Sequence, residues 1–201
     1  MYKRFFKRSA DIIVSLGGIL IVSPFFIPVL LFVFWKTKGN PFFIQKRPGL
    51  NERIFTLIKM RTMTNSRDSE GNLLPDKDRM TGWGNFLRET SLDEIPQFIN
   101  VLKGDMSLIG PRPLLPEYLP LYSDFHKKRH QIRPGITGWA QINGRNSISW
   151  QQKLDLDVWY VENLSFKIDM QIFLQTIKKI FTRKNVNRSA EVTMPWFEGD
   201  P

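Results

Sequence analysis

The sequence predicts an α+β protein, in which an N-terminal re-entrant membrane helix-break-helix packs on a small cytoplasmic α/β globular domain with amphipathic interfacial helices. Three observations lead to this fold class. Residues 12–35 carry no charge, residues 41–63 are strand-rich, and residues 150–164 and 168–183 show helical patterns, the second of them largely apolar on one face. We expect the membrane segment to anchor the chain and the two later regions to build the domain.

The composition narrows the classes of partner. The chain of 201 residues has no cysteine, which excludes disulfides and Cys-ligated metals and fits a reducing compartment. Its formal net charge is +10, which indicates an acidic partner. Nucleic acid, anionic lipid headgroups and phosphorylated small molecules all qualify, and the hydrophobic N-terminus helps to choose among them.

The uncharged N-terminal segment is long enough to cross a membrane, at about 24 residues. Basic residues flank both ends: Lys3, Arg4, Lys7 and Arg8 before it, and Lys36, Lys38, Lys46 and Arg47 after it. Because basic flanks favour the cytoplasmic side, both ends are expected there.

A break at Ser23-Pro24 explains how both ends reach one side. Proline removes a backbone donor and clashes with the preceding turn. Each arm then has about 12 residues and spans roughly 18 Å, which is too short for a ~30 Å hydrocarbon core. A re-entrant hairpin is the favoured interpretation. A kinked full span and a buried helix of a soluble protein are the alternatives.

The remaining elements follow from turn and capping signals. We expect a membrane hairpin with basic flanks over residues 1–38, a cytoplasmic domain over residues 39–184 and a poorly ordered tail over residues 185–201. Ser91-x-x-Glu94 matches a capping box for a helix that ends at Gly104, with an irregular start at Pro96. Residues 64–79 are polar and are expected to form a surface loop. Helix 168–183 ends in basic residues and either lies on a membrane surface or packs on the core.

The adjacent acids Asp93 and Glu94 are the strongest candidates for chemistry. Neighbouring side chains on a helix diverge by about 100°, so two separate roles are easier to imagine than one shared proton. A helix N-terminus stabilises carboxylates and phosphates alike, although ordinary helix capping explains the same pair. Arginines in rigid or apolar surroundings are candidate phosphate ligands: Arg88, Arg112, Arg133 and Arg145. His126 and His130 are expected to lie on a solvated basic face rather than to bind zinc.

Several motifs occur together in a fixed order along the chain. They are Ser23-Pro24, the QKRPG turn at residues 45–49, KMRTM at 59–63, SLDEIPQ at 91–97, LKGDMS at 102–107, GPRP at 110–113 and RPGITG at 133–138. In this set the chain resembles the bacterial sugar transferases, the small monotopic phosphoglycosyl transferases. It looks closest to those that begin protein N-glycosylation with a diacetylated bacillosamine phosphate.

The resemblance implies transfer of a sugar-1-phosphate from a UDP-sugar to undecaprenyl phosphate, with release of UMP, at the cytoplasmic face of the bacterial inner membrane. It implies that Asp93 is the nucleophile that holds the phosphosugar covalently and that Glu94 binds Mg²⁺. Lys59, Arg88, Arg112 and Arg145 would bind substrate phosphates. Membrane lipid is then a partner and nucleic acid is not, and a homodimer or a complex with other glycosyltransferases of the pathway would be consistent with it.

Two other classes of function remain open at this point. One is a Mg²⁺-dependent hydrolase of nucleotide-sugars or lipid phosphates, and the other is a non-enzymatic binder of anionic lipid or nucleic acid. The sequence leaves open the sugar, the glycoconjugate pathway, the oligomeric state, and whether Glu94 acts as metal ligand, base or both.

Overall fold

The computed structural model describes residues 2–37, 39–144, 148–182 and 195–199. The α-helices are α1 Lys7–Thr37, α2 Asp76–Arg79, α3 Gly82–Glu89, α4 Gln97–Lys103, α5 Asp124–Lys127, α6 Trp139–Ile142, α7 Trp150–Glu162 and α8 Phe166–Thr182. The strands are β1 Phe42–Pro48, β2 Ile54–Met60, β3 Ser107–Ile109 and β4 Gly135–Thr137. A π-helix η1 Tyr2–Phe6 and the 3₁₀-helices η2 Leu50–Glu52, η3 Leu92–Glu94, η4 Pro116–Leu121 and η5 Lys128–Gln131 complete the described elements. The mixed helix and sheet composition that the sequence predicts is confirmed.

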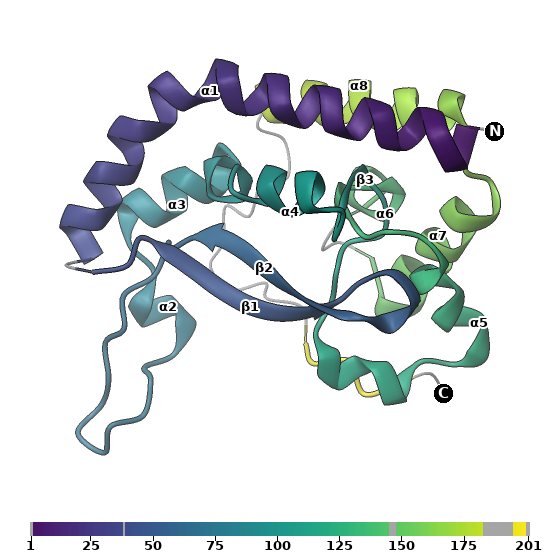
Figure 1. The fold of residues 1–201 in the computed structure, drawn as a ribbon. Coiled ribbons are helices and arrows are strands. Elements are labelled where there is room, and N and C mark those ends of the chain that lie inside the picture. The colour runs from purple at the N-terminus through teal and green to yellow at the C-terminus, as the bar shows by residue number, and fades with distance from the viewer. Residues whose placement is uncertain (1, 38, 145–147, 183–194, 200–201) are drawn as a thin grey trace.

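The N-terminal segment forms one continuous helix that bends, rather than two helices with a break (Figure 1). Pro24 and Pro28 lie inside α1 and account for the bend, because each removes one helical hydrogen bond and crowds the preceding turn. The Ser23 hydroxyl donates to the Leu20 carbonyl at 3.1 Å. The helix is long and apolar enough to cross a membrane, with 6% of its most apolar window buried in the fold. This exposed apolar surface agrees with an anchor, while the re-entrant arrangement stays a prediction.

The first turns of α1 are fixed to the domain by polar contacts. Arg8 donates from its guanidinium to the carbonyls of Val101 at 2.6 Å and Leu102 at 3.0 Å, at the C-terminal end of α4. The carboxylate of Asp11 accepts from the hydroxyl of Ser107 at 3.1 Å and from the backbone N–H of Leu108 at 3.0 Å. Buried acceptors are thereby satisfied where α1 meets β3 and α4.

The two-stranded sheet β1–β2 confirms the strand-rich region. Its antiparallel register pairs Phe42 with Met60 and Pro48 with Ile54. In Figure 1, α4 lies between α1 and this hairpin, so the molecule has three layers in this region. Asn100 of α4 joins the layers, since its side-chain amide donates to the Thr56 carbonyl at 2.7 Å and its side-chain oxygen accepts from the Ile58 N–H at 3.1 Å.

The short parallel pair β3–β4 brings two distant motifs together. Ser107 pairs with Gly135, and Ile109 pairs with Thr137. A Cβ at Gly135 would lie 2.1 Å from the backbone nitrogen of Gly110, so this crossing requires glycine. The RPG segment at residues 133–135 is therefore held directly beside the strand that leads to the GPRP segment at residues 110–113.

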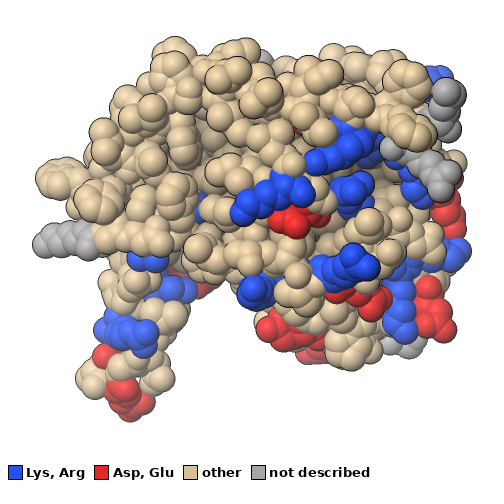
Figure 2. Space-filling view, viewed as in Figure 1, with Lys and Arg blue, Asp and Glu red and all other residues tan. Residues whose placement is uncertain are grey.

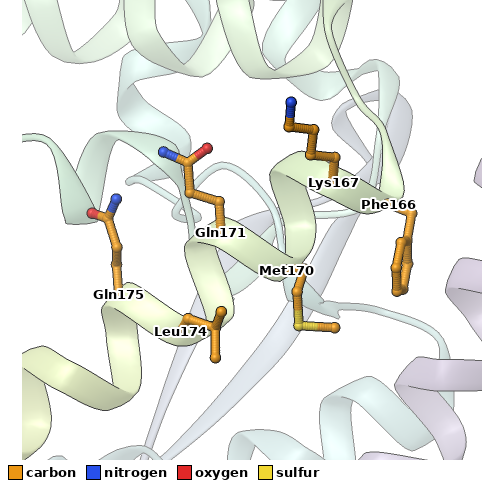
Figure 3. Close-up of a pocket in the computed structure, with 6 residues that line it drawn as sticks. All are labelled: Phe166, Lys167, Met170, Gln171, Leu174 and Gln175. Carbon is orange, nitrogen blue, oxygen red and sulfur yellow. The ribbon is translucent and has the colours of Figure 1, made fainter.

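Helix α8 packs on the core and also leaves an apolar surface exposed. Ile172 is fully buried, whereas Phe166 is 61% and Leu174 is 59% exposed. Figure 3 shows Phe166, Met170 and Leu174 along one side of the helix and Lys167, Gln171 and Gln175 along the other, around a shallow hollow. Figure 2 shows that the surface over α1 is largely free of charged side chains, which gather over the domain beneath it.

Candidate active site

The acidic pair lies in an irregular connection between α3 and α4. Ser91 has φ 58°, in the left-handed region, and the next three residues form η3. Pro96 is the N-cap of α4, and Gly104, with φ 91°, is its C-cap. The irregular start and the glycine cap are as predicted, but the capping box is wrong. The Ser91 side chain makes no capping hydrogen bond, and the Glu94 side chain turns toward two cations instead.

Glu94 forms the centre of a charged cluster. Its Oε1 accepts from Lys59 Nζ of β2 at 2.8 Å and from Arg112 Nη2 at 2.8 Å. Burial alone would raise the pKa of the Glu94 carboxyl, but Arg112 and Lys59 outweigh burial and hold it well below its usual range. Glu94 in turn raises the pKa of Arg112. Glu94 and Arg112 are thus an ionised pair at neutral pH. Burial lowers the pKa of Lys59, and the charge of Glu94 acts against that decrease.

Asp93 has a different electrostatic environment from that of its neighbour. The residue is 8% exposed. Burial and the negative charge of Glu94 raise the pKa of Asp93 to about 6, while the charges of Lys59, Arg112 and Arg88 act against this rise. Asp93 is therefore an ionised carboxylate at neutral pH that is poorly solvated and surrounded by cations. Such a carboxylate is suited to nucleophilic attack on an anionic substrate.

Helix α3 brings Arg88 to the same place. The Nε of Arg88 donates to the hydroxyl of Thr62 at 3.0 Å. The close approach of α3 to this segment depends on Gly84, since a Cβ there would lie 1.9 Å from the Thr62 carbonyl oxygen. Arg88 is thereby held near enough to Asp93 for its charge to act on the pKa of that carboxyl.

An open cavity of about 1120 Å³ connects these groups with a second wall. One part of it is lined by the acidic pair Asp93 and Glu94 and the cations around them. Another part is lined by Leu115, Tyr118, Trp150 and Lys153. Part of the polar loop 64–79 also lines it, including Arg79. This surface loop is confirmed, with the short α2 at its end, and it projects from the domain in Figure 1. The volume and the cationic lining suit a phosphorylated ligand of nucleotide-sugar size.

A buried ion pair supports the segment that carries Arg112. The Nη2 of Arg129 donates to Asp157 Oδ2 at 2.7 Å and to the backbone carbonyl of Arg112 at 2.7 Å. Arg129 and Asp157 are each 2% exposed. Burial favours the neutral forms, yet Asp157 raises the pKa of Arg129. Arg129 therefore fixes the Pro-Arg-Pro turn from behind while the Arg112 side chain reaches Glu94.

A family model described as bacterial sugar transferase matches residues 2–183. The chain belongs to the bacterial sugar transferase family.

Individual relatives of this sugar transferase agree with the match. An uncharacterized sugar transferase, EpsL, of Bacillus subtilis is 49% identical over 193 residues, covering 96% of each chain. An undecaprenyl-phosphate galactose phosphotransferase of Salmonella typhimurium is 36% identical over 90% of this chain and 41% of its own length. A UDP-N-acetylgalactosamine-undecaprenyl-phosphate N-acetylgalactosaminephosphotransferase of Aeromonas hydrophila is 36% identical over 89% of this chain and 44% of its own. The sugar transferase thus spans nearly all of EpsL and less than half of the two phosphotransferases.

The structure brings five of the predicted site residues of the sugar transferase together, namely Lys59, Arg88, Asp93, Glu94 and Arg112. Arg145 lies outside the described residues. Arg133 does not join the site, because its Nε donates to the Gly104 carbonyl at 2.8 Å. Ser23 and Pro24 lie at the bend of α1.

Sequence reasoning missed the ion pair behind the site. The run HKKRH at residues 126–130 looked solvated, but His126 is 1% and His130 5% exposed, so that prediction is wrong. A signal for Asp157 was present in α7, where Leu154, Asp157, Val158 and Val161 share one buried face. A lone carboxylate on an apolar helical face requires a buried cationic partner.

Replacing Arg129 with Met in the sugar transferase is expected to cost about 3–5 kcal/mol of stability, because it leaves the carboxylate of Asp157 buried and unpaired. The double variant Arg129→Met/Asp157→Leu should recover most of that stability. It should not recover activity, because the Arg112 carbonyl still lacks its donor. Thermal unfolding and transferase rate, measured on both variants, check this. Full activity in the stable double variant would show that Arg129 does not position Arg112.

Proposed function

We propose that this protein transfers a sugar-1-phosphate from a UDP-sugar to undecaprenyl phosphate and releases UMP, through a covalent phosphosugar on Asp93. One observation carries the proposal. A buried carboxylate with a raised pKa lies in a cationic cavity beside a second carboxylate that is held ionised by Lys59 and Arg112. The names of the two phosphotransferase relatives refer to the same lipid acceptor, one with galactose and one with N-acetylgalactosamine.

In the first step a carboxylate oxygen of Asp93 attacks the phosphorus that carries the sugar. A bond forms between this oxygen and phosphorus, the phosphorus–oxygen bond to UMP breaks, and UMP leaves with the electron pair. Arg88 and Arg112 are the cations available to the diphosphate oxygens, and they stabilise the charge that develops on them. Arg112 does so from a fixed position, because Glu94 holds it together with Lys59.

In the second step an oxygen of undecaprenyl phosphate attacks the same phosphorus. The bond to Asp93 breaks and the free carboxylate is restored, so the enzyme ends unchanged. Dividing the reaction allows a water-soluble donor and a lipid acceptor to use one carboxylate in turn. It also avoids bringing two mutually repelling anionic substrates together at once.

The donor set is compatible with Mg²⁺, which usually binds through one or two carboxylates together with water and substrate phosphates. Glu94 would hold it, since its bonds to Lys59 and Arg112 use Oε1 and not Oε2. Among the described residues no cluster of three or more His, Asp or Glu residues forms a metal cage. When bound, the ion would supply positive charge to the phosphate oxygens of the donor.

We also propose that α1 enters and leaves the cytoplasmic leaflet of the bacterial inner membrane from the same side. Basic residues at both ends and the bend at Pro24 and Pro28 support this placement. The chain has no cysteine, so single probes are unambiguous. Lys3→Cys and Asn40→Cys should both react with a membrane-impermeant maleimide only in inside-out vesicles. Labelling of the two sites from opposite sides would establish a full span.

The proposed function is tested by UMP release from purified protein in detergent, with Mg²⁺, undecaprenyl phosphate and a panel of UDP-sugars. We expect release with one or a few sugars and a matching lipid-linked product. Continuous release without the lipid would identify a hydrolase. Binding to anionic vesicles with no release from any sugar would identify a lipid-binding protein.

A further inference from the structure

The C-terminal segment Pro195–Gly199 packs against Tyr118 and Trp150, which line the cavity that also contains Asp93 and Glu94. Residues 185–201 were expected to be poorly ordered, but Phe197 is 2% exposed and belongs to a cluster with Tyr118, Tyr122 and Leu154. Residues 185–194, 200 and 201 lie outside the described part of the chain. The buried aromatic ring shows that the end of the chain takes part in the fold.

Tyr118 is held between three other rings. Its ring centroid lies 4.9 Å from that of Trp196, 5.5 Å from that of Phe197 and 5.5 Å from that of Trp150, each in an edge-to-face arrangement. Edge-to-face pairs at these separations are favourable beyond the area that they bury. Two of the three partners of Tyr118 therefore come from the last few residues of the chain.

Trp150 is fixed by the same segment. Its indole N–H donates to the carbonyl of Pro195 at 2.8 Å, and its ring centroid lies 5.5 Å from that of Phe197. Tyr118 and Trp150 both line the cavity that contains Asp93 and Arg112. Residues 195–199 are not among the residues that line this cavity, so the segment contacts Tyr118 and Trp150 without lining it.

Tyr118 and Trp150 lie close in sequence to residues of the site or to residues that support it. Tyr118 lies in η4, which begins four residues after Arg112. Trp150 begins α7, which also carries Lys153 of the cavity wall and Asp157, the partner of Arg129. A shift of either element would change the width of the cavity. We infer that Pro195–Phe197 is a positioning segment that holds η4 against the start of α7 and so sets the affinity of the cavity for the nucleotide-sugar donor.

The inference rests on the proposed function, and the test is a comparison of KM and kcat. Phe197→Ala and a truncation after Met194 should each raise the KM for the donor about tenfold. In both variants, kcat and the KM for undecaprenyl phosphate should stay within about twofold of the wild-type values. The change weakens binding of the donor equally in the ground state and the transition state, and the reactive groups are retained. Phe197→Tyr should restore the donor KM. Glu198→Gln, a change of an exposed side chain next to Phe197, should leave all constants unchanged.

A stability control separates positioning from loss of fold. Ile172→Ala removes a fully buried side chain from a different cluster, which does not line the cavity. It should lower the melting temperature without raising the donor KM. The inference would be overturned by an unchanged donor KM in folded Phe197→Ala, or by an equally large rise of the donor KM in Ile172→Ala. In either case, UMP release by the wild type would still uphold the proposed function. Absence of UMP release from the intact protein would overturn both.

Discussion

Asp93→Asn is expected to lower the rate of sugar-phosphate transfer by about 10³-fold or more, because the amide retains the shape of the side chain and is not a nucleophile. Neither half-reaction should survive in this variant. The measurements are UMP release and intact mass of the protein after incubation with donor alone. The wild type should gain the mass of one phosphosugar, and the variant should gain nothing.

The same substitution should raise stability, which separates loss of chemistry from loss of fold. The pKa of Asp93 is raised to about 6 in the folded protein from 3.8, so the folded state binds the proton more tightly than the unfolded state does. Stability from this group is complete below pH 3.8 and is lost as the pH rises through about 6. The neutral amide avoids that loss, so Asp93→Asn should unfold at higher temperature than the wild type at pH 8, by about 1–3 kcal/mol in free energy.

A lower melting temperature in Asp93→Asn at pH 8, together with lost activity, would contradict this account of the site. The control is Asp68→Asn in the exposed loop 64–79, which should change neither activity nor the pH dependence of stability. Near-wild-type UMP release by Asp93→Asn would rule out Asp93 as the nucleophile.

The parts of the fold that sequence reasoning predicted are those set by local rules. The antiparallel hairpin around the QKRPG turn, the cap at Gly104 and the two C-terminal helices each depend on residues within a few positions. The sequence placed the interruption of α1 at its prolines, where the helix bends, but it predicted a break where the helix is continuous. A proline removes one hydrogen bond, and the remaining bonds of a long apolar helix suffice to carry it through in bent form.

The structure brings together five of the residues named from the sequence, but the sequence did not predict how they pair. Asp93, Glu94 and Arg112 stand out as residue types, yet the pairing of Glu94 with Lys59 joins positions 35 residues apart. A local signal, the capping box, gave the wrong partner for Glu94 because two cations offer a buried carboxylate more than one backbone N–H does. The burial of Arg129 and of Phe197 was not predicted either, because tertiary contacts decide whether a basic run or a chain end is buried.

Glu94→Gln is expected to lower the transfer rate by about 10²–10³-fold, through loss of the charge that holds Lys59 and Arg112 in place. It should also move the pH dependence of the remaining activity. The negative charge of Glu94 raises the pKa of Asp93, whereas the positive charges of Lys59 and Arg112 lower it. The variant removes the negative charge and keeps the positive ones, so the pKa of Asp93 should fall. Because the pKa of Asp93 is about 6, we expect the acidic limb of the wild-type rate profile near that pH, and the variant should shift it to lower pH.

Two readouts separate the structural role of Glu94 from a role in metal binding. If Glu94 only orders the cations, the acidic limb shifts and the Mg²⁺ concentration for half-maximal rate stays unchanged. If it also binds the ion, that concentration rises in Glu94→Gln as well. Glu70→Gln in the exposed loop is the matched control and should alter neither quantity. An acidic limb that stays near pH 6 would show that the protonation of Asp93 is governed by burial alone, and the two acids would then act independently despite their adjacency.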